Sequence, residues 1–173
     1  MCILHIRHWE SDMDFDTDVL ICGAGAAGLT LALDLARRNV PFRLVERQDT
    51  PFHGSRGKGI QPRTLEVFED LGIADRAVAL GGPYPPQRIH AADGSHADVP
   101  IAAEQAATPA EPYATPLMLP QSLTEQVMRE RLLELGQRVE CGLALTGLEQ
   151  DADGVTVTLA GRGGESRLRA RYV

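Results

Sequence analysis

Apolar residues dominate the chain just after residue 16, and their pattern predicts a strand followed by a helix. Residues 17–22 (TDVLIC) form a short apolar run of the kind found in buried strands. Residues 26–38 place apolar side chains at helical spacing, and two arginines occupy the end that a helix dipole makes negative. Residues 42–46 (FRLVE) predict a second strand. Together these segments predict a βαβ unit with a parallel pair of strands.

Helical periodicity returns in three later segments. One pattern begins at Pro62, because proline suits the first turn of a helix, and a short one covers residues 73–80. A longer pattern covers residues 122–135. Ser122 is expected to cap this last helix, with Glu125 three residues further on completing a capping box. These segments add three helices to the predicted βαβ unit.

The remaining segments predict an irregular excursion and a set of antiparallel strands. Residues 81–120 are rich in proline and predict a long, mostly irregular excursion, a kind of segment that often carries function. Residues 143–150, 155–160 and 166–170 alternate apolar and polar positions, and turns containing glycine separate them. The fold class predicted for residues 16–173 is therefore α/β: a Rossmann-like βαβ dinucleotide-binding domain with a parallel sheet plus an antiparallel β-meander.

Composition and charge narrow the class of protein. The chain has 173 residues, of which 43% are hydrophobic and 24% charged, enough for one globular domain with a core. The formal net charge of −7 argues against nucleic acid and anionic membranes as partners, because both require basic patches. The three cysteines are far apart and form no Cys-x-x-Cys pair, which predicts a reduced, cytoplasmic protein.

An uncharged run over residues 19–33 raises the question of a membrane span. Asp34 and Arg37 end the run short of the roughly 20 residues that a span requires. Aspartates precede the run, where a signal peptide would carry positive charge. Neither a membrane span nor a signal peptide is therefore expected.

The first residues of the chain are expected to lie outside the folded domain. Residues 1–15 are predicted to be a disordered N-terminal extension, and Met13 begins a segment that resembles a natural start. Cys2, His5 and His8 have a spacing that could hold a metal ion. A frayed terminus is the favoured interpretation of these three residues, so no metal site is predicted.

The connection between the first strand and the first helix reads CGAGAAG and spaces its glycines as Gly23-x-Gly25-x-x-Gly28. This spacing is the dinucleotide fingerprint. Gly23 permits a tight turn, Gly25 lets the backbone approach a pyrophosphate, and Gly28 lets the helix pack closely on the sheet. The helix N-terminus adds free N–H groups and a partial positive charge. The pattern predicts a bound diphosphate; the alternative is that the glycines serve helix–sheet packing alone.

A carboxylate ends the second predicted strand. Glu46 follows the glycines at about the distance at which an acidic residue accepts hydrogen bonds from the ribose hydroxyls of an adenosine. The same charge repels a 2′-phosphate, so NADP is not expected in this site. These features predict a nucleotide site and leave NAD and FAD as alternatives.

Four segments go beyond this fingerprint: DVLICGAGAAGLTLALDLARRNVPFRLVERQ, GSRGKGIQPRTLEVFEDLGI, LPQSLTEQVMRERLLELG and RARYV. Together they resemble the FAD-dependent aromatic hydroxylases, the p-hydroxybenzoate hydroxylase-like flavoprotein monooxygenases. The second segment is the most specific, because an NAD dehydrogenase has no reason to follow its acidic residue with Ser-Arg-Gly and Gln-Pro-Arg-Thr. The resemblance runs from about Asp16 to the last residue.

The resemblance implies that the turn between strand and helix binds the pyrophosphate of FAD. Gly23, Gly25 and Gly28 are expected to contact the pyrophosphate. Ala26 and Ala27 are expected to begin the helix over the pyrophosphate. No catalytic residue is implied within this chain.

Four further residues are implied to bind other parts of FAD. Glu46 is expected to hold the adenosine ribose, and Arg47 to lie beside the adenine or its ribose. Arg56 is expected at the phosphate side of the flavin nucleotide, and Gln121 near the ribityl chain and pyrophosphate. The alternatives are an exposed Arg47 packed along the surface, a solvated Arg56, and a Gln121 that only supports the helix N-terminus.

The resemblance also implies an activity and a missing part. In this family NADH or NADPH reduces FAD, and the reduced flavin uses oxygen to hydroxylate an aromatic, often phenolic, small molecule.

A second flavin motif (an Asp-Gly pair) and the substrate domain follow the RARYV segment in the family. The expectation is therefore an N-terminal part truncated before the substrate domain and too short to be active alone. A catalytically silent nucleotide-binding fragment and the NAD-binding domain of a dehydrogenase remain alternatives. The choice of NADH or NADPH, the aromatic substrate and the oligomeric state are not specified.

Overall fold

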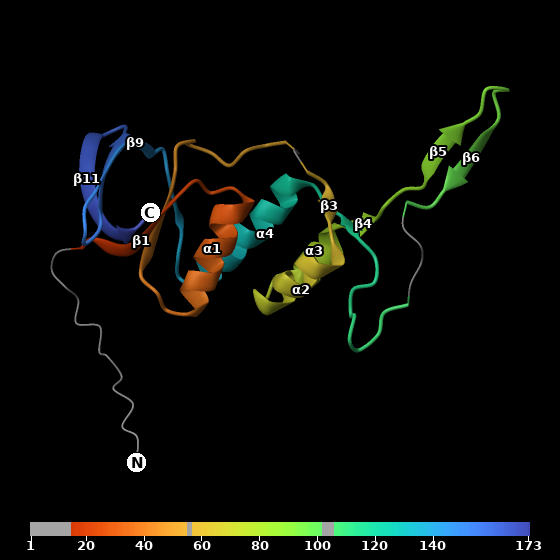
Figure 1. Ribbon diagram of the computed structural model, residues 1–173, viewed down its shortest axis with the longest axis horizontal. Coiled ribbons are helices and arrows are strands. Elements are labelled where there is room, and N and C mark those ends of the chain that lie inside the picture. Colours follow the sequence, from red (N-terminus) through yellow and green to blue (C-terminus); the bar gives the residue numbers. More distant parts are fainter. Residues whose placement is uncertain (1–14, 55–56, 102–105) are drawn as a thin grey trace, which may run out of the picture.

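The central element of the fold is a six-stranded sheet (Figure 1). The computed structural model describes residues 15–54, 57–101 and 106–173. In spatial order the strands of the sheet are β8 (Val139–Cys141), β2 (Phe42–Glu46), β1 (Thr17–Cys22), β11 (Gly164–Tyr172), β10 (Val155–Gly161) and β9 (Ala144–Gln150). The first four strands are parallel, and β10 and β9 are antiparallel to their neighbours. The predicted α/β class with a parallel sheet and an antiparallel meander is confirmed.

The meander continues the parallel sheet. β11 pairs in parallel with β1, with Thr17 opposite Ala170 and Val19 opposite Tyr172. β2 pairs with the other side of β1. The chain therefore proceeds to opposite sides of β1, and the carboxyl end of β1 is a topological switch point, where open α/β sheets bind their ligands.

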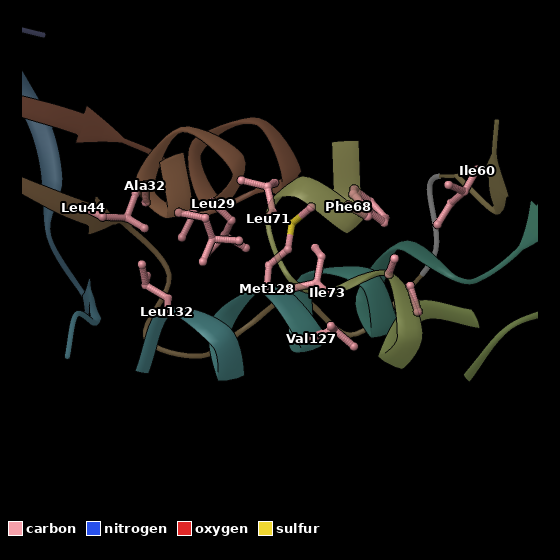
Figure 2. Packing of buried hydrophobic residues seen from close by; sticks show 14 of the residues in the cluster. Leu29, Ala32, Leu44, Ile60, Phe68, Leu71, Ile73, Val127, Met128 and Leu132 are labelled. Atoms are coloured by element: carbon pink, nitrogen blue, oxygen red, sulfur yellow. The ribbon is translucent and has the colours of Figure 1, made fainter. Parts of the chain in front are cut away.

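Four helices share one apolar core with β1 and β2: α1 (Ala26–Arg37), α2 (Pro62–Asp70), α3 (Ala74–Leu80) and α4 (Gln121–Glu134). Figure 2 shows Leu29 of α1, Phe68 of α2 and Met128 of α4 in this core. Leu29 is fully buried, as are Leu44 of β2 and Leu132 of α4. Burying each of these side chains contributes about 2–3 kcal/mol, so the core fixes α1 and α4 against the sheet.

The opposite face of β1 and β2 is covered by the meander. Alternation along the strands turns Leu20 and Val45 to this side, where they join a second buried cluster. The meander supplies the rest of the cluster, including Val157 of β10 and Leu168 of β11. Among the residues that the structure describes, the buried members of this second cluster all come from strands of the sheet.

Residues 81–120 contain short strands within a mostly irregular segment. Part of this excursion joins a three-stranded sheet made of β3 (Gly59–Ile60), β7 (Leu117–Met118) and β4 (Gly82–Pro83). Another part forms a hairpin of β5 (Gln87–His90) and β6 (His96–Val99), whose residues are all exposed and which extends away from the helices (Figure 1). Cross-strand pairing supplies the order of these short strands.

One prediction needs correction, and one strand was not predicted. α4 begins at Gln121 after Pro120, with no side-chain capping bond, so Ser122 is not its N-cap and the predicted capping box is wrong. Glu125 is buried within the helix and bonds to other side chains. β8 was not predicted, because its three residues are too few to show an alternation of apolar and polar positions.

Candidate functional site

A tight turn connects β1 to α1 at the switch point of the sheet. Gly23 has a φ of 107°, in the region that favours glycine, and its N–H donates to the Val45 carbonyl at 2.8 Å. Gly28 lies in the first turn of α1, where an added Cβ would lie 2.0 Å from the Gly23 carbonyl oxygen. The helix can start this close to the turn only because residue 28 is glycine.

Gly25 differs from these two glycines, because the surrounding protein does not require its lack of a side chain. An added Cβ would meet only Glu125 Oε1, at an ordinary contact distance of 3.8 Å. The N–H groups of Ala26, Ala27 and Gly28 have no acceptor among the residues that the structure describes, and the first turn has no acidic side chain. Free amides beside an unblocked backbone fit an anion such as a diphosphate.

Glu46 lies against this turn at the end of β2. Its Oε2 accepts a hydrogen bond from the Ala24 N–H at 2.8 Å, and its Oε1 accepts one from the Gln48 N–H at 3.0 Å. Burial has the largest single influence on the pKa of Glu46 and raises it. The two amide donors and the positive charges of Arg47 and Arg129 together outweigh burial, so the pKa lies below its ordinary value. Glu46 is therefore ionised at neutral pH.

Three polar side chains of α4 lie at the turn, at intervals of four residues. Gln121 Nε2 donates to Glu125 Oε1 at 2.7 Å. Arg129 Nη2 donates to the Ala24 carbonyl at 2.8 Å and lies 3.4 Å from Glu125 Oε2. Sequence reasoning assigned Gln121 to the site but missed Glu125 and Arg129. The four-residue spacing of polar residues on one helix face was the available signal.

Two cavities flank the N-terminus of α1. The first, of about 610 Å³, is lined by Gly25, Glu46 and the three polar residues of α4. The second, of about 750 Å³, begins at Ala26 and Ala27 and has mostly apolar walls. Gln121 lines both cavities. This arrangement fits an elongated dinucleotide whose diphosphate crosses the turn and whose two ends occupy the two cavities.

The remaining predicted residues have different outcomes. Arg47 is exposed and lines the first cavity beside Glu46. Arg56 lies outside the described residues. Its neighbour Gly57 lines the second cavity, and the Gly57 carbonyl accepts the Gln121 N–H at 3.0 Å. Gly57 therefore lies at the N-terminus of α4.

The structure supplies no sign of a metal site or a membrane span where it describes the chain. Cys2, His5 and His8 lie outside the described residues. Within residues 15–54, 57–101 and 106–173, no three His, Cys, Asp or Glu side chains are grouped to hold a metal ion. In the same ranges no helix combines the length and apolar character needed to cross a membrane.

Comparison with known proteins identifies the family to which this site is related. A family described as "FAD binding domain" matches residues 16–173. A flavin-dependent monooxygenase of Mycobacteroides abscessus is 38% identical over 160 residues, which cover 90% of this chain and 34% of that protein. A 6-methylpretetramide 4-monooxygenase of Streptomyces rimosus is 38% identical over 148 residues, which cover 82% of this chain and 25% of that protein.

Solved structures show the same fold. The flavin-dependent monooxygenase PieE, solved in complex with FAD and substrate, is similar with a TM-score of 0.77 and 32% identity. The match covers 90% of this chain and 29% of PieE. The anhydrotetracycline hydroxylase OxyS from Streptomyces rimosus is similar with a TM-score of 0.72 and 34% identity, over 90% of this chain and 30% of OxyS. The chain thus spans about a third or less of the length of these relatives.

Proposed function

Because this chain belongs to the FAD binding domain family, we propose that it binds FAD across the glycine turn, as the N-terminal part of a flavin-dependent monooxygenase. One observation carries the proposal. Three amides at the start of α1 have no acceptor among the described residues, and they lie beside Gly25, whose lack of a side chain the surrounding protein does not require. A bound diphosphate would accept hydrogen bonds from these amides and would occupy the space beside Gly25.

The two cavities suggest how FAD lies on this chain. Glu46 and Arg47 hold the adenosine end of FAD in the first cavity. The Glu46 carboxylate accepts hydrogen bonds from the ribose hydroxyls. The α1 amides and Gly25 hold the diphosphate. Gln121, which lines both cavities, contacts the diphosphate and the ribityl chain. The second cavity takes the ribityl chain, and Arg56 is assigned to the phosphates.

The proposed activity of the whole enzyme is hydroxylation of an aromatic, phenolic small molecule in the cytoplasm. Bound FAD would supply the redox chemistry, with NADH or NADPH as reductant and O₂ as the oxygen donor. Relatives named for 6-methylpretetramide, anhydrotetracycline and rifampicin support small molecules as the substrate class. The described residues of this chain would bind and orient the cofactor, and none of them is assigned a step on the substrate.

Titration of the purified chain tests the proposal. Quenching of flavin fluorescence should report saturable binding of FAD, and NAD and NADP should compete weakly. Gln121→Ala should weaken FAD binding about tenfold through loss of a contact to the diphosphate. Gln126→Ala, on the exposed side of the same helix, is the matched control and should leave affinity unchanged. Tighter binding of NAD than of FAD would favour the dehydrogenase alternative.

Oxygen uptake separates the monooxygenase from a silent nucleotide-binding module. NADH- or NADPH-driven oxygen consumption that a phenol stimulates is expected from the whole enzyme. The chain of residues 1–173 is expected to bind FAD without this activity. A phenol-stimulated uptake by this chain alone would show that residues 1–173 are sufficient for the reaction.

A further inference from the structure

A buried carboxylate lies at the place where the proposed cofactor carries its negative charge. Within the described ranges, Glu125 is the only charged side chain that is buried, with 3% of its surface exposed. Its Oε1 lies 3.8 Å from the position that a Cβ of Gly25 would occupy. A carboxylate next to the proposed diphosphate would repel it unless a positive charge compensates.

Arg129 supplies a positive charge at this point. Its Nη2 is 3.4 Å from Glu125 Oε2, and the same nitrogen donates to the Ala24 carbonyl at 2.8 Å. The N–H of Ala24 is already held by Glu46. Both polar groups of Ala24, the residue between two glycines of the turn, are thus fixed by ionised side chains from different elements.

Packing of α4 alone does not account for this pair. The helix already buries Val127, Met128 and Leu132 in the core. Apolar replacements for a buried ion pair are often as stable as the pair itself. An ion pair at this position therefore calls for a role in addition to holding the helix in place.

We propose that Arg129 is a positioning residue for the cofactor diphosphate. It neutralises Glu125 and holds the Ala24 carbonyl, so that Gly25 and the free α1 amides face the diphosphate without a competing negative charge. This inference rests on the proposed function, because it concerns the same site. It adds a residue of α4, 105 positions from Ala24 in the chain, to the machinery of the turn.

Three variants of the chain test the inference by FAD titration. Arg129→Met should weaken FAD binding about tenfold or more, because it leaves Glu125 uncompensated beside the diphosphate. Glu125→Gln should tighten binding about threefold, since it leaves the positive charge of Arg129 unpaired beside the diphosphate. The double variant should recover part of the lost affinity and stay below wild type, because the Ala24 carbonyl still lacks its Arg129 donor. Weaker binding by Glu125→Gln, or no rescue in the double variant, would overturn the inference.

Urea unfolding distinguishes a failure of this inference from a failure of the proposed function. Arg129→Met should lower the unfolding midpoint, and Glu125→Gln in that background should restore it, because the uncompensated buried charge is then gone. Arg129→Lys should retain most of the midpoint. A wild-type chain that binds no FAD would overturn the proposed function and the cofactor role of Arg129. If Glu125→Gln did not restore the unfolding midpoint of Arg129→Met, the proposal that Arg129 neutralises Glu125 would be overturned separately.

Discussion

At the scale of single residues, two glycines of the turn face different neighbours. Gly28 faces backbone, since an added Cβ would lie 2.0 Å from the Gly23 carbonyl oxygen. Gly25 faces open space apart from Glu125 Oε1 at 3.8 Å. The first is needed for folding, and the second is free to serve a ligand. The fingerprint spacing alone does not separate these two requirements.

Alanine substitutions at the two positions should therefore have different effects on stability. Gly28→Ala forces backbone apart and should lower the free energy of unfolding by about 3 kcal/mol. Gly25→Ala should change it by less than about 1 kcal/mol, because only the helix N-cap preference is altered. Urea denaturation of both variants measures the difference. Equal losses would mean that the described geometry of the turn is wrong.

The lowered pKa of Glu46 predicts a pH dependence of stability. A depressed folded-state pKa stabilises the fold above the ordinary glutamate pKa of about 4.3, and this contribution is lost as pH falls through the folded-state value. Glu46→Gln should therefore be less stable than wild type at pH 7, and the difference should shrink below about pH 4. Urea midpoints at both pH values test this.

The matched control is Glu165→Gln, because Glu165 is exposed on β11. Its difference from wild type should be small at neutral pH. A Glu46→Gln difference that grows on acidification would contradict the hydrogen bonds assigned to the carboxylate.

At the scale of elements, α4 is held by its buried face, and its N-terminus has no side-chain cap. Pro120 occupies the N-cap position, and Ser122 makes no capping bond. Ser122→Ala should therefore change the free energy of unfolding by less than about 0.5 kcal/mol, whereas loss of a true cap costs about 1 kcal/mol. Leu132→Ala, at a fully buried position of the same helix, should cost about 2–5 kcal/mol. A large effect at Ser122 would restore the capping box.

Local patterns were sufficient to predict most elements. The apolar runs of β1 and β2 and the periodicity of α1 lie within short windows, and the structure confirms them. The order of the strands in the sheet depends on pairing between distant segments of the chain. The parallel pairing of β11 with β1 joins residues more than 150 positions apart, and no local window shows it.

The candidate site follows the same division. The spacing of the glycines and of Glu46 is local, so these residues could be assigned from the sequence. The pattern S-x-x-E that suggested a capping box is shared by helices whose glutamate is buried. Only the fold shows that Glu125 and Arg129 belong to the site, because it places Glu125 beside Gly25 and Arg129 against the Ala24 carbonyl.

At the scale of the whole molecule, β11 joins the two parts of the sheet. It lies between β1 and β10, and its Leu168 and Ala170 belong to the second buried cluster. Deletion of residues 164–173 should therefore abolish cooperative unfolding, because it removes an interior strand. Circular dichroism during urea titration measures the loss.

Replacement of residues 87–99 by a short glycine-serine linker is the matched control for this deletion. The strands of the β5–β6 hairpin are exposed throughout, so cooperative unfolding should be retained. A folded chain without β11, or an unfolded one without the hairpin, would contradict the described topology.

The central claim is that a diphosphate binds against the bare backbone at Gly25. FAD titration of the wild-type chain and of Gly25→Val, followed by flavin fluorescence, tests it most directly. The valine side chain should weaken FAD binding about tenfold or more while the urea midpoint stays close to wild type. Equal affinities, or no binding by either protein, would contradict the account.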